Sequence, residues 1–231
     1  MADFLFGKFM IIKIEKNIAD MKIGILGTRS HCFSRVLDRY KVEYSKIEID
    51  EIDKSYDFIF ESGVYKIIPE DILSLPTYGI VGIHESPLPE GKGHAPIQWA
   101  VLNGRKNLTI TLYRLNRGVD SGQIINQHNV AILKEDTLTE LNRKRESGIS
   151  ECFKVFLDEI ISGHMVLRDQ SGKGSYHKRR DLNSCELDLE EKLGDLWDNI
   201  RICDNEKYPA WFRIGNKKIT LRYEVTELED I

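Results

Sequence analysis

The sequence contains little cysteine, and what it has follows no recognisable pattern. Its four cysteines form no Cys-x-x-Cys pair and have no histidine at a metal-ligand spacing; they are Cys32, Cys152, Cys185 and Cys203. Disulfide frameworks and zinc sites depend on such spacings, so we expect neither, and no metal. Scattered thiols of this kind are typical of reduced cysteines in the cytosol, which predicts a cytoplasmic protein.

The chain also lacks an excess of charge of one sign. Lysine and arginine together number 33 against 37 aspartate and glutamate residues, which gives a formal net charge of -4. A surface that binds a phosphate backbone needs a concentrated positive field, so no nucleic-acid partner is expected. The apolar and charged fractions are those of an ordinary globular chain, which excludes disordered and collagen-like classes.

No apolar run is long enough to predict a membrane-spanning helix. The strongest candidate, residues 4–12, contains Lys8 and shows neither a basic lead-in nor a small-residue cleavage site. It therefore predicts neither a signal peptide nor a membrane partner. We interpret residues 1–21 as an N-terminal extension or an extra strand ahead of the first domain.

From residue 22 onward, short apolar runs alternate with helical patterns. The predicted strands cover 22–27, 42–49, 56–60, 79–83, 108–115 and 123–132, and the predicted helices cover 33–40, 69–75 and 96–103. Such alternation favours an α/β fold with a doubly wound, mostly parallel sheet. A capping box formed by Thr137 and Glu140 predicts a further long helix that Gly163 ends, so the first domain is expected to cover 22–165.

The remaining residues, 166–231, are expected to form a small C-terminal region. It starts with a Gly-rich basic stretch, 171–180, that we interpret as a linker or rim loop, and continues with a helix capped by Asp188. Gly215 and Asn216 then separate the two strands of a predicted hairpin. Its apolar face needs a cover, and a second copy of the chain is the natural candidate, so we expect a homodimer.

Two loops bounded by glycine and proline carry one histidine and one aspartate. His84 lies in the loop 82–93, directly after a predicted strand, and Asp120 lies in the loop 118–122. Ligands of parallel sheets bind beyond the carboxyl ends of the strands, so His84 lies where function is expected. A carboxylate near an imidazole fixes its tautomer and raises its basicity, which suits proton transfer. We therefore predict a functional pair and keep a purely structural pair as the alternative.

Other motifs have weaker interpretations. Gly24 and Gly27 lack the third glycine of a dinucleotide fingerprint, so a nicotinamide-dependent reductase is an alternative with little support. Ser86 lacks the Gly-x-Ser-x-Gly surroundings of a nucleophile elbow. We therefore interpret its hydroxyl as stabilising a turn, with a nucleophile as the alternative. The basic run 178–180 is interpreted as a solvated face, with an approach to a diphosphate as the alternative.

The segment 61–132 resembles the formyltransferases that use 10-formyltetrahydrofolate. Their pattern of Asn-x-His, Ser-Leu-Leu-Pro, a Gly-rich turn, a Pro-Ile-Gln-Trp-Ala helix and a Val/Leu-Asp-Ser/Thr-Gly loop is reproduced in order and spacing over 82–125. The resemblance implies that His84 and Asp120 are catalytic and that 10-formyltetrahydrofolate is the formyl donor. One position departs from the family pattern, because Gly82 stands where the family has Asn. The carboxamide that would hydrogen-bond the developing oxyanion is therefore missing. A backbone N–H or Gln98 replaces it, or the chain is slow or inactive.

The same resemblance implies a pterin pocket and a substrate site. The expected donor-binding residues are Tyr65, Lys66, Ile67, Ile68, Val119 and Asp120. The expected substrate-binding residues are Ser86, Lys92 and Gln98.

The acceptor is chosen by exclusion within that family. A methionyl-tRNA enzyme is expected to carry a longer C-terminal nucleic-acid domain and a basic surface, and the glycinamide ribonucleotide type to be shorter. Residues 208–212 and the hairpin after them are similar to the nucleotide-sugar N-formyltransferases of surface polysaccharide biosynthesis. We therefore expect transfer of the formyl group to a nucleotide-linked amino sugar. Another small amine, or an inactive folate-binding homologue, remains an alternative.

Overall fold

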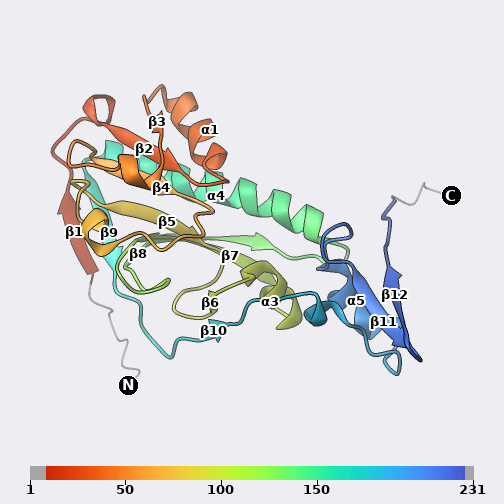
Figure 1. The fold of residues 1–231 in the computed structure, drawn as a ribbon. Helices are drawn as coiled ribbons and strands as arrows, with labels where there is room; N and C mark the ends of the chain where they lie inside the picture. Colours follow the sequence, from red (N-terminus) through yellow and green to blue (C-terminus); the bar gives the residue numbers. More distant parts are fainter. Residues whose placement is uncertain (1–8, 227–231) are drawn as a thin grey trace, which may run out of the picture.

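The computed structural model describes residues 9–226 and is built around one eight-stranded sheet (Figure 1). The strands lie in the order β1 (Phe9–Lys13), β9 (His164–Arg168), β8 (Ile124–Ala131), β7 (Asn107–Arg114), β5 (Ile80–His84), β4 (Phe58–Glu61), β2 (Ile23–Leu26) and β3 (Ser45–Lys46). Two short pairs stand apart from this sheet, β6 (Lys92–Gly93) with β10 (Tyr176–His177), and β11 (Ala210–Ile214) with β12 (Lys217–Leu221).

The sheet changes direction at β5. Strands β3, β2, β4 and β5 pair in parallel, whereas β7, β8, β9 and β1 continue the sheet in antiparallel pairs. The predicted α/β class is confirmed, but the sheet is mixed rather than mostly parallel. Buried apolar runs look alike in either direction, so the sequence pattern did not reveal the reversal. The expected strand 42–49 is reduced to β3 at the edge.

Helices cover both faces of the sheet. They are α1 (His31–Tyr40), α2 (Glu70–Leu73), α3 (Pro96–Leu102), α4 (Leu138–Ile161) and α5 (Leu193–Arg201), with 3-10 turns at Ile18–Asp20, Ile49–Glu51 and Asn183–Cys185. The long helix α4 runs beside α1 along one face (Figure 1). Phe33, Phe60 and Phe153 pack ring against ring there. Ile68 and Ile80 belong to a smaller core on strands β2, β4 and β5, with α2 packed against it.

The start of α4 follows from its sequence. The Glu140 amide donates to the Thr137 hydroxyl, and the Thr137 amide donates back to the Glu140 carboxylate at 3.0 Å. This confirms the predicted capping box, and Gly163, with φ +84°, follows the end of the helix as expected. The helix is thereby held with its first turns at the cavity described below.

The N-terminal apolar run adds an edge strand to the main sheet, one of the two interpretations that its sequence allowed. Strand β1 pairs antiparallel with β9, from Phe9 opposite Arg168 to Lys13 opposite His164. Residues 1–8 lie outside the described part of the chain. The domain boundaries expected after residues 21 and 165 remain predictions, and the sheet contains strand residues from both sides of each.

The C-terminal region contacts the site loop and ends in the predicted hairpin. Strand β10 pairs in parallel with β6, so the stretch expected to be a linker or rim loop is tied to residues 92–93. Helix α5 begins at Leu193 and not at Asp188, because the Asp188 side chain accepts from the Glu190 amide in a separate turn. Gly215, with φ +55°, makes the two-residue turn between β11 and β12, as predicted. No helix formed by residues 9–226 combines the length and the hydrophobicity that crossing a membrane requires.

Candidate active site

The carboxyl ends of three parallel strands open into one cavity of about 680 Å³. Arg29 follows β2, Glu61 ends β4 and His84 ends β5. The loop 116–120, the start of α3 and the first turns of α4 complete the walls. Parallel strands present their carboxyl ends at one edge, so residues distant in the sequence meet where ligands of such sheets bind.

His84 is buried and its ring is oriented by a backbone carbonyl. Its Nε2 lies 2.8 Å from the Gly91 carbonyl oxygen, and its Nδ1 lies 3.6 Å from Oδ2 of Asp120. A carbonyl can only accept, so Nε2 carries a hydrogen and, in the neutral ring, Nδ1 carries the lone pair. The nitrogen that can exchange a proton therefore faces the carboxylate. We expected Asp120 to fix the tautomer, but the Gly91 carbonyl does so.

Asp120 is held by groups from three parts of the chain. Its Oδ2 accepts from the Gly93 amide at 2.8 Å, and its Oδ1 accepts from the Tyr113 hydroxyl at 3.0 Å. Its backbone carbonyl accepts from Gln170 Nε2 at 2.9 Å, and the same amide group donates to Gly122 at 2.8 Å. The residue has φ +47°, a left-handed conformation that aspartate tolerates better than most residues. The loop thus aims the carboxylate at His84.

Two glycines allow these loops to approach each other. Gly93 has φ +96°, and a Cβ there would lie 2.6 Å from the His177 carbonyl oxygen. A Cβ on Gly122 would lie 1.7 Å from the Arg114 carbonyl oxygen. Only glycine fits either position, which explains why both loops are bounded by it.

Tyr113 supports Asp120 from β7. Burial and the nearby charge of Asp120 raise the pKa of its hydroxyl well above the usual range. The phenol therefore keeps its proton over the physiological range and donates to the carboxylate. In the sequence this residue looks like an ordinary member of an alternating strand, so its contact with Asp120 was not predicted.

Glu61 is a second carboxyl group on the cavity wall, and sequence analysis missed it as well. It is only 8% exposed, and burial raises its pKa to about 8, although the Val64 amide and the Arg29 guanidinium favour the charged form. The charges of Asp120 and Glu85 raise it further. The available signal was an acidic residue at the end of the apolar run Phe58-Ile59-Phe60.

A cluster of three charged side chains lines the cavity near His84. The Glu85 carboxylate lies 3.5 Å from the Arg29 guanidinium and 3.8 Å from Nε of Arg145, and all three side chains are largely buried. Burial of charge is costly unless the charges are paired, and here two cations share one anion. The cluster therefore has a net positive charge that faces the cavity.

The predicted donor-binding residues lie together in the structure. Tyr65, Lys66, Ile67, Ile68 and Val119 all line the cavity with Asp120. Tyr65 and Ile67 are 85% and 82% exposed, which is unusual for large apolar side chains, whereas Ile68 is buried.

The predicted substrate-binding residues are split. Gln98 lines the cavity, but Ser86 and Lys92 do not. The Ser86 hydroxyl donates to the Glu90 carbonyl at 2.7 Å, which is the turn-stabilising role that sequence analysis favoured over a nucleophile. The Lys92 amide donates to Ser175 at 3.0 Å, so its backbone fastens the site loop to the C-terminal region.

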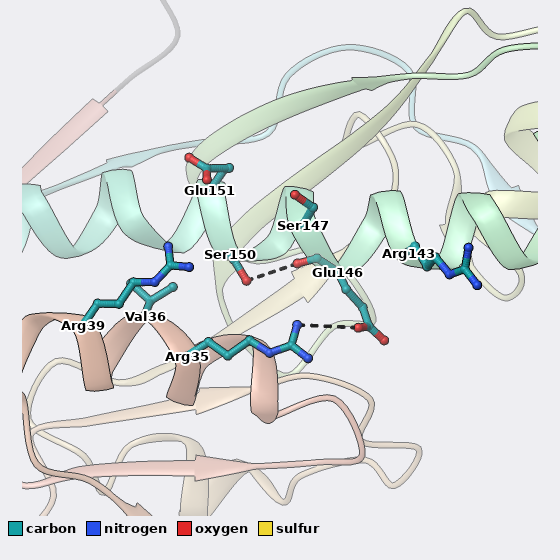
Figure 2. A pocket seen from close by; sticks show the side chains of 8 residues that line it. All are labelled: Arg35, Val36, Arg39, Arg143, Glu146, Ser147, Ser150 and Glu151. Atoms are coloured by element: carbon teal, nitrogen blue, oxygen red, sulfur yellow. Dashed lines mark hydrogen bonds and ion pairs between the residues drawn. The ribbon is translucent and has the colours of Figure 1, made fainter.

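A smaller hollow of about 310 Å³ lies between α1 and α4 and is shown in Figure 2. Arg35 and Arg39 on α1 and Arg143 on α4 border it, with Glu146 3.9 Å from Arg35. His31, Cys32 and Glu146 bring ligand atoms within 4.8 Å of one another nearby. Burial raises the pKa of the Cys32 thiol to about 11, which disfavours the thiolate that a metal needs. This trio therefore fits a metal poorly.

Comparison with known proteins identifies the family. Residues 30–153, more than half of the 231 in the chain, match the family described as formyl transferase. The chain belongs to the formyl transferase family. A methionyl-tRNA formyltransferase of Caldanaerobacter subterraneus subsp. tengcongensis is 35% identical over 105 residues, which cover 46% of this chain and 34% of that protein. The match thus spans about a third of that relative.

Solved structures of several formyltransferases share the fold. The formyltransferase PseJ from Anoxybacillus kamchatkensis, in complex with UDP-4,6-dideoxy-4-formamido-L-AltNAc and tetrahydrofolate, is 28% identical, with 68% of this chain and 85% of that one covered and a TM-score of 0.58. A 4-N formyltransferase from Francisella tularensis covers 90% of this chain and 99% of its own at 18% identity and a TM-score of 0.72. A methionyl-tRNA formyltransferase from Clostridium thermocellum gives the same TM-score of 0.72 at 21% identity, with 90% and 94% covered.

Proposed function

We propose that this protein transfers a formyl group from 10-formyltetrahydrofolate to the amino group of a nucleotide-linked amino sugar. The observation that carries the proposal is the convergence of His84 and Asp120 in the cavity, with Nδ1 and Oδ2 3.6 Å apart. Family membership supports the reaction type, and the site supports the residues that perform it.

The residues around the cavity suit the formyl donor. The pyrimidine half of its reduced pterin is flat and largely apolar on its faces, and the exposed side chains of Tyr65, Ile67 and Val119 offer apolar surface next to Asp120. When bound, the donor supplies an activated formyl carbon attached to N10. Tyr65, Lys66, Ile67, Ile68 and Val119 would hold the ring system, and Asp120 would lie beside the reacting end.

The pair of side chains then handles one proton. A neutral amine attacks the formyl carbon, a new C–N bond forms, and the bond from that carbon to N10 breaks, so the products are a formamide and tetrahydrofolate. The proton lost by the amine ends on N10. Nδ1 of His84 and the Asp120 carboxylate are the two groups placed to accept and return that proton, directly or through water. The Gly91 carbonyl keeps the imidazole in position during the transfer.

The charged cluster supports an anionic acceptor. Arg29 and Arg145 share the single carboxylate of Glu85, which leaves one positive charge on a largely buried wall. A diphosphate placed against this wall would gain charge-assisted hydrogen bonds in a partly dehydrated site. The acceptor is also suggested by PseJ, whose structure contains a UDP-linked formamido sugar. Gln98, from α3, lies on the same cavity for contacts with the acceptor.

The test is incubation of the purified protein with 10-formyltetrahydrofolate and a panel of amino-sugar nucleotides carrying the amine at carbon 3 or carbon 4. We expect mass spectrometry to detect a formylated nucleotide sugar in step with release of tetrahydrofolate. A parallel reaction contains methionyl-tRNA, because a methionyl-tRNA formyltransferase is among the relatives. Formylation of the tRNA alone would refute the sugar acceptor but keep formyl transfer. Folate binding with no formylated product from any acceptor would instead indicate an inactive homologue.

A further inference from the structure

A glycine occupies the position at which the formyltransferase pattern has an asparagine, and a carboxyl group fills the space beside it. A Cβ built on Gly82 would lie 2.4 Å from Oε1 of Glu61 and 2.4 Å from Cδ1 of Leu115. A side chain at position 82 is therefore incompatible with Glu61 as it lies. The two positions are coupled, since the glycine makes room for the glutamate.

The register of the sheet places this carboxyl group on the same face as His84. Glu61 and Gly82 are partners in the parallel pair of β4 and β5. Alternate residues of a strand point to the same face, so a side chain at position 82 would share the face of His84. The Glu61 carboxyl group thus occupies the space into which a side chain at position 82 would extend, and it lines the same cavity as His84.

The surroundings of Glu61 keep a proton on it. Burial raises its pKa to about 8, with the charges of Asp120 and Glu85 acting in the same direction. The main opposing cation, Arg29, lies 3.5 Å from Glu85 and is shared with it. The remaining titratable neighbour, the Tyr113 phenol, is itself held neutral by burial. At neutral pH the group is therefore mostly a carboxylic acid, which has an O–H to donate, as a carboxamide has an N–H.

We propose that Glu61 replaces the missing asparagine and donates a hydrogen bond to the formyl oxygen as negative charge develops on it. This assignment rests on the proposed function. Gln98, the side chain that the sequence offered for the role, lines the cavity from α3, whereas the atoms nearest a Cβ at position 82 belong to Glu61 and Leu115. A neutral carboxylic acid in a dehydrated site is a known type of oxyanion donor.

The test compares Glu61→Ala with Glu61→Gln at saturating formyl donor. Removal of one oxyanion donor costs about a hundredfold or more in kcat, so we expect a loss of that size in the alanine variant with little change in KM. The glutamine variant, which keeps a donor of nearly the same shape, should recover most of the activity. Wild-type kcat should fall above about pH 8, where Glu61 ionises, and Glu61→Gln should lack that decline.

Several results would overturn the role of Glu61. With an active wild type, an alanine variant within about threefold of it, or a glutamine variant as poor as the alanine one, would do so. Titration of the Glu61 side-chain carbon by NMR in the ligand-free protein is independent of turnover. A pKa near the ordinary glutamate value would remove the donor, whether or not the wild type transfers formyl. Absence of transfer by the wild type would instead refute the proposed function, and the catalytic role of Glu61 with it.

Combining substitutions at positions 61 and 82 tests whether the two side chains share one location. Gly82→Asn alone places a side chain against the Glu61 carboxyl group, so it should lower activity. In a Glu61→Ala background the carboxyl group is gone and only the flexible end of the Leu115 side chain must move, so the same substitution should raise activity above that of Glu61→Ala alone. Recovery of this kind is specific for a shared location, because two independent structural defects would add their losses.

Discussion

Asp120 and Glu61, two of the carboxyl groups that line the cavity, have different surroundings. The carboxylate of Asp120, on the loop after β7, accepts one hydrogen bond on each oxygen, from Gly93 and from Tyr113. Glu61, at the end of β4, forms no salt bridge with any residue between 9 and 226, and burial dominates its ionisation. One acid is fixed as an acceptor by its neighbours, and the other is kept protonated by lack of water.

This difference shows how one site can hold both a proton acceptor and a proton donor. Like charges in one dehydrated site repel, so a charged Asp120 itself favours the protonated form of Glu61. Environments that separate the ionisation of two acids are a general means to assign them opposite roles. We therefore expect substitutions at the two positions to differ both in the size of their effects and in the property that they change.

The largest effect is expected for Asp120→Asn. Asparagine keeps the size of the side chain and tolerates the positive φ of position 120, so the loop should remain in place. It cannot accept the proton, and turnover should fall by about a thousandfold or more. The measurement is kcat for formyl transfer, with folate affinity from a binding titration as the control. Near-normal turnover would contradict the assignment of Asp120 as a proton acceptor.

The location of His84 and Asp120 in one cavity could be predicted from the sequence because their signals are local, whereas their catalytic role stays a prediction. A loop bounded by glycine and proline after an apolar strand indicates a site at the end of that strand, whatever the rest of the fold. The capping box of Thr137 and Glu140 is similarly local, and it placed the start of α4. Asp188 shows the limit of such signals, because aspartate caps a turn as readily as a helix.

The apolar run before Glu61 marks it only as an acid at a strand end, and the role proposed for it could not be predicted, because that role depends on a neighbour 21 residues later in the chain. The sequence shows that Gly82 lacks the expected carboxamide, but the register of β4 against β5 decides which side chain fills that space. The protonation of Glu61 depends on burial by residues from several elements. The antiparallel pairing of the strands from β7 onward was not predicted for a related reason. An apolar run does not indicate which strand it pairs with or in which direction.

A large effect on stability is expected for Glu61→Gln as the pH rises. The folded protein holds this proton up to about pH 8, whereas the unfolded chain releases it near 4.5, so folding stability is lost progressively between those values. The glutamine side chain does not ionise, so the variant does not lose this folding stability as the pH rises. Relative to wild type, the variant should therefore gain several kcal/mol in unfolding free energy between about pH 5 and about pH 9.

Urea denaturation of both proteins at the two pH values measures this gain. The matched control is Glu70→Gln, which removes a carboxylate from an exposed position of α2. Its difference from wild type should stay nearly constant with pH. If Glu61→Gln behaved like this control, Glu61 would be an ordinary ionised acid and the contrast with Asp120 would disappear.

A moderate effect is expected for Tyr113→Phe. This substitution removes the hydroxyl that donates to Oδ1 of Asp120 and leaves the ring in the core. Loss of one such bond is worth about 1 kcal/mol, so kcat should fall about fivefold to tenfold. Tyr40→Phe is the matched control, because the Tyr40 hydroxyl donates to Asp158 far from the cavity. Equal effects of the two substitutions would show that Tyr113 does not act through Asp120.

The smallest effect is expected for Gln170→Ala, which tests how the C-terminal part of the chain supports the loop that carries Asp120. Gln170 donates to the backbone carbonyls of Asp120 and Gly122, so its loss loosens the loop but leaves the carboxylate and its two donors intact. We expect a KM for the formyl donor raised by about threefold and a nearly unchanged kcat. Gln123→Ala is the control, since Gln123 donates to the exposed Asp169 side chain and not to the loop. A kcat loss as large as that of Asp120→Asn would mean that the loop, rather than the carboxylate it carries, limits the reaction.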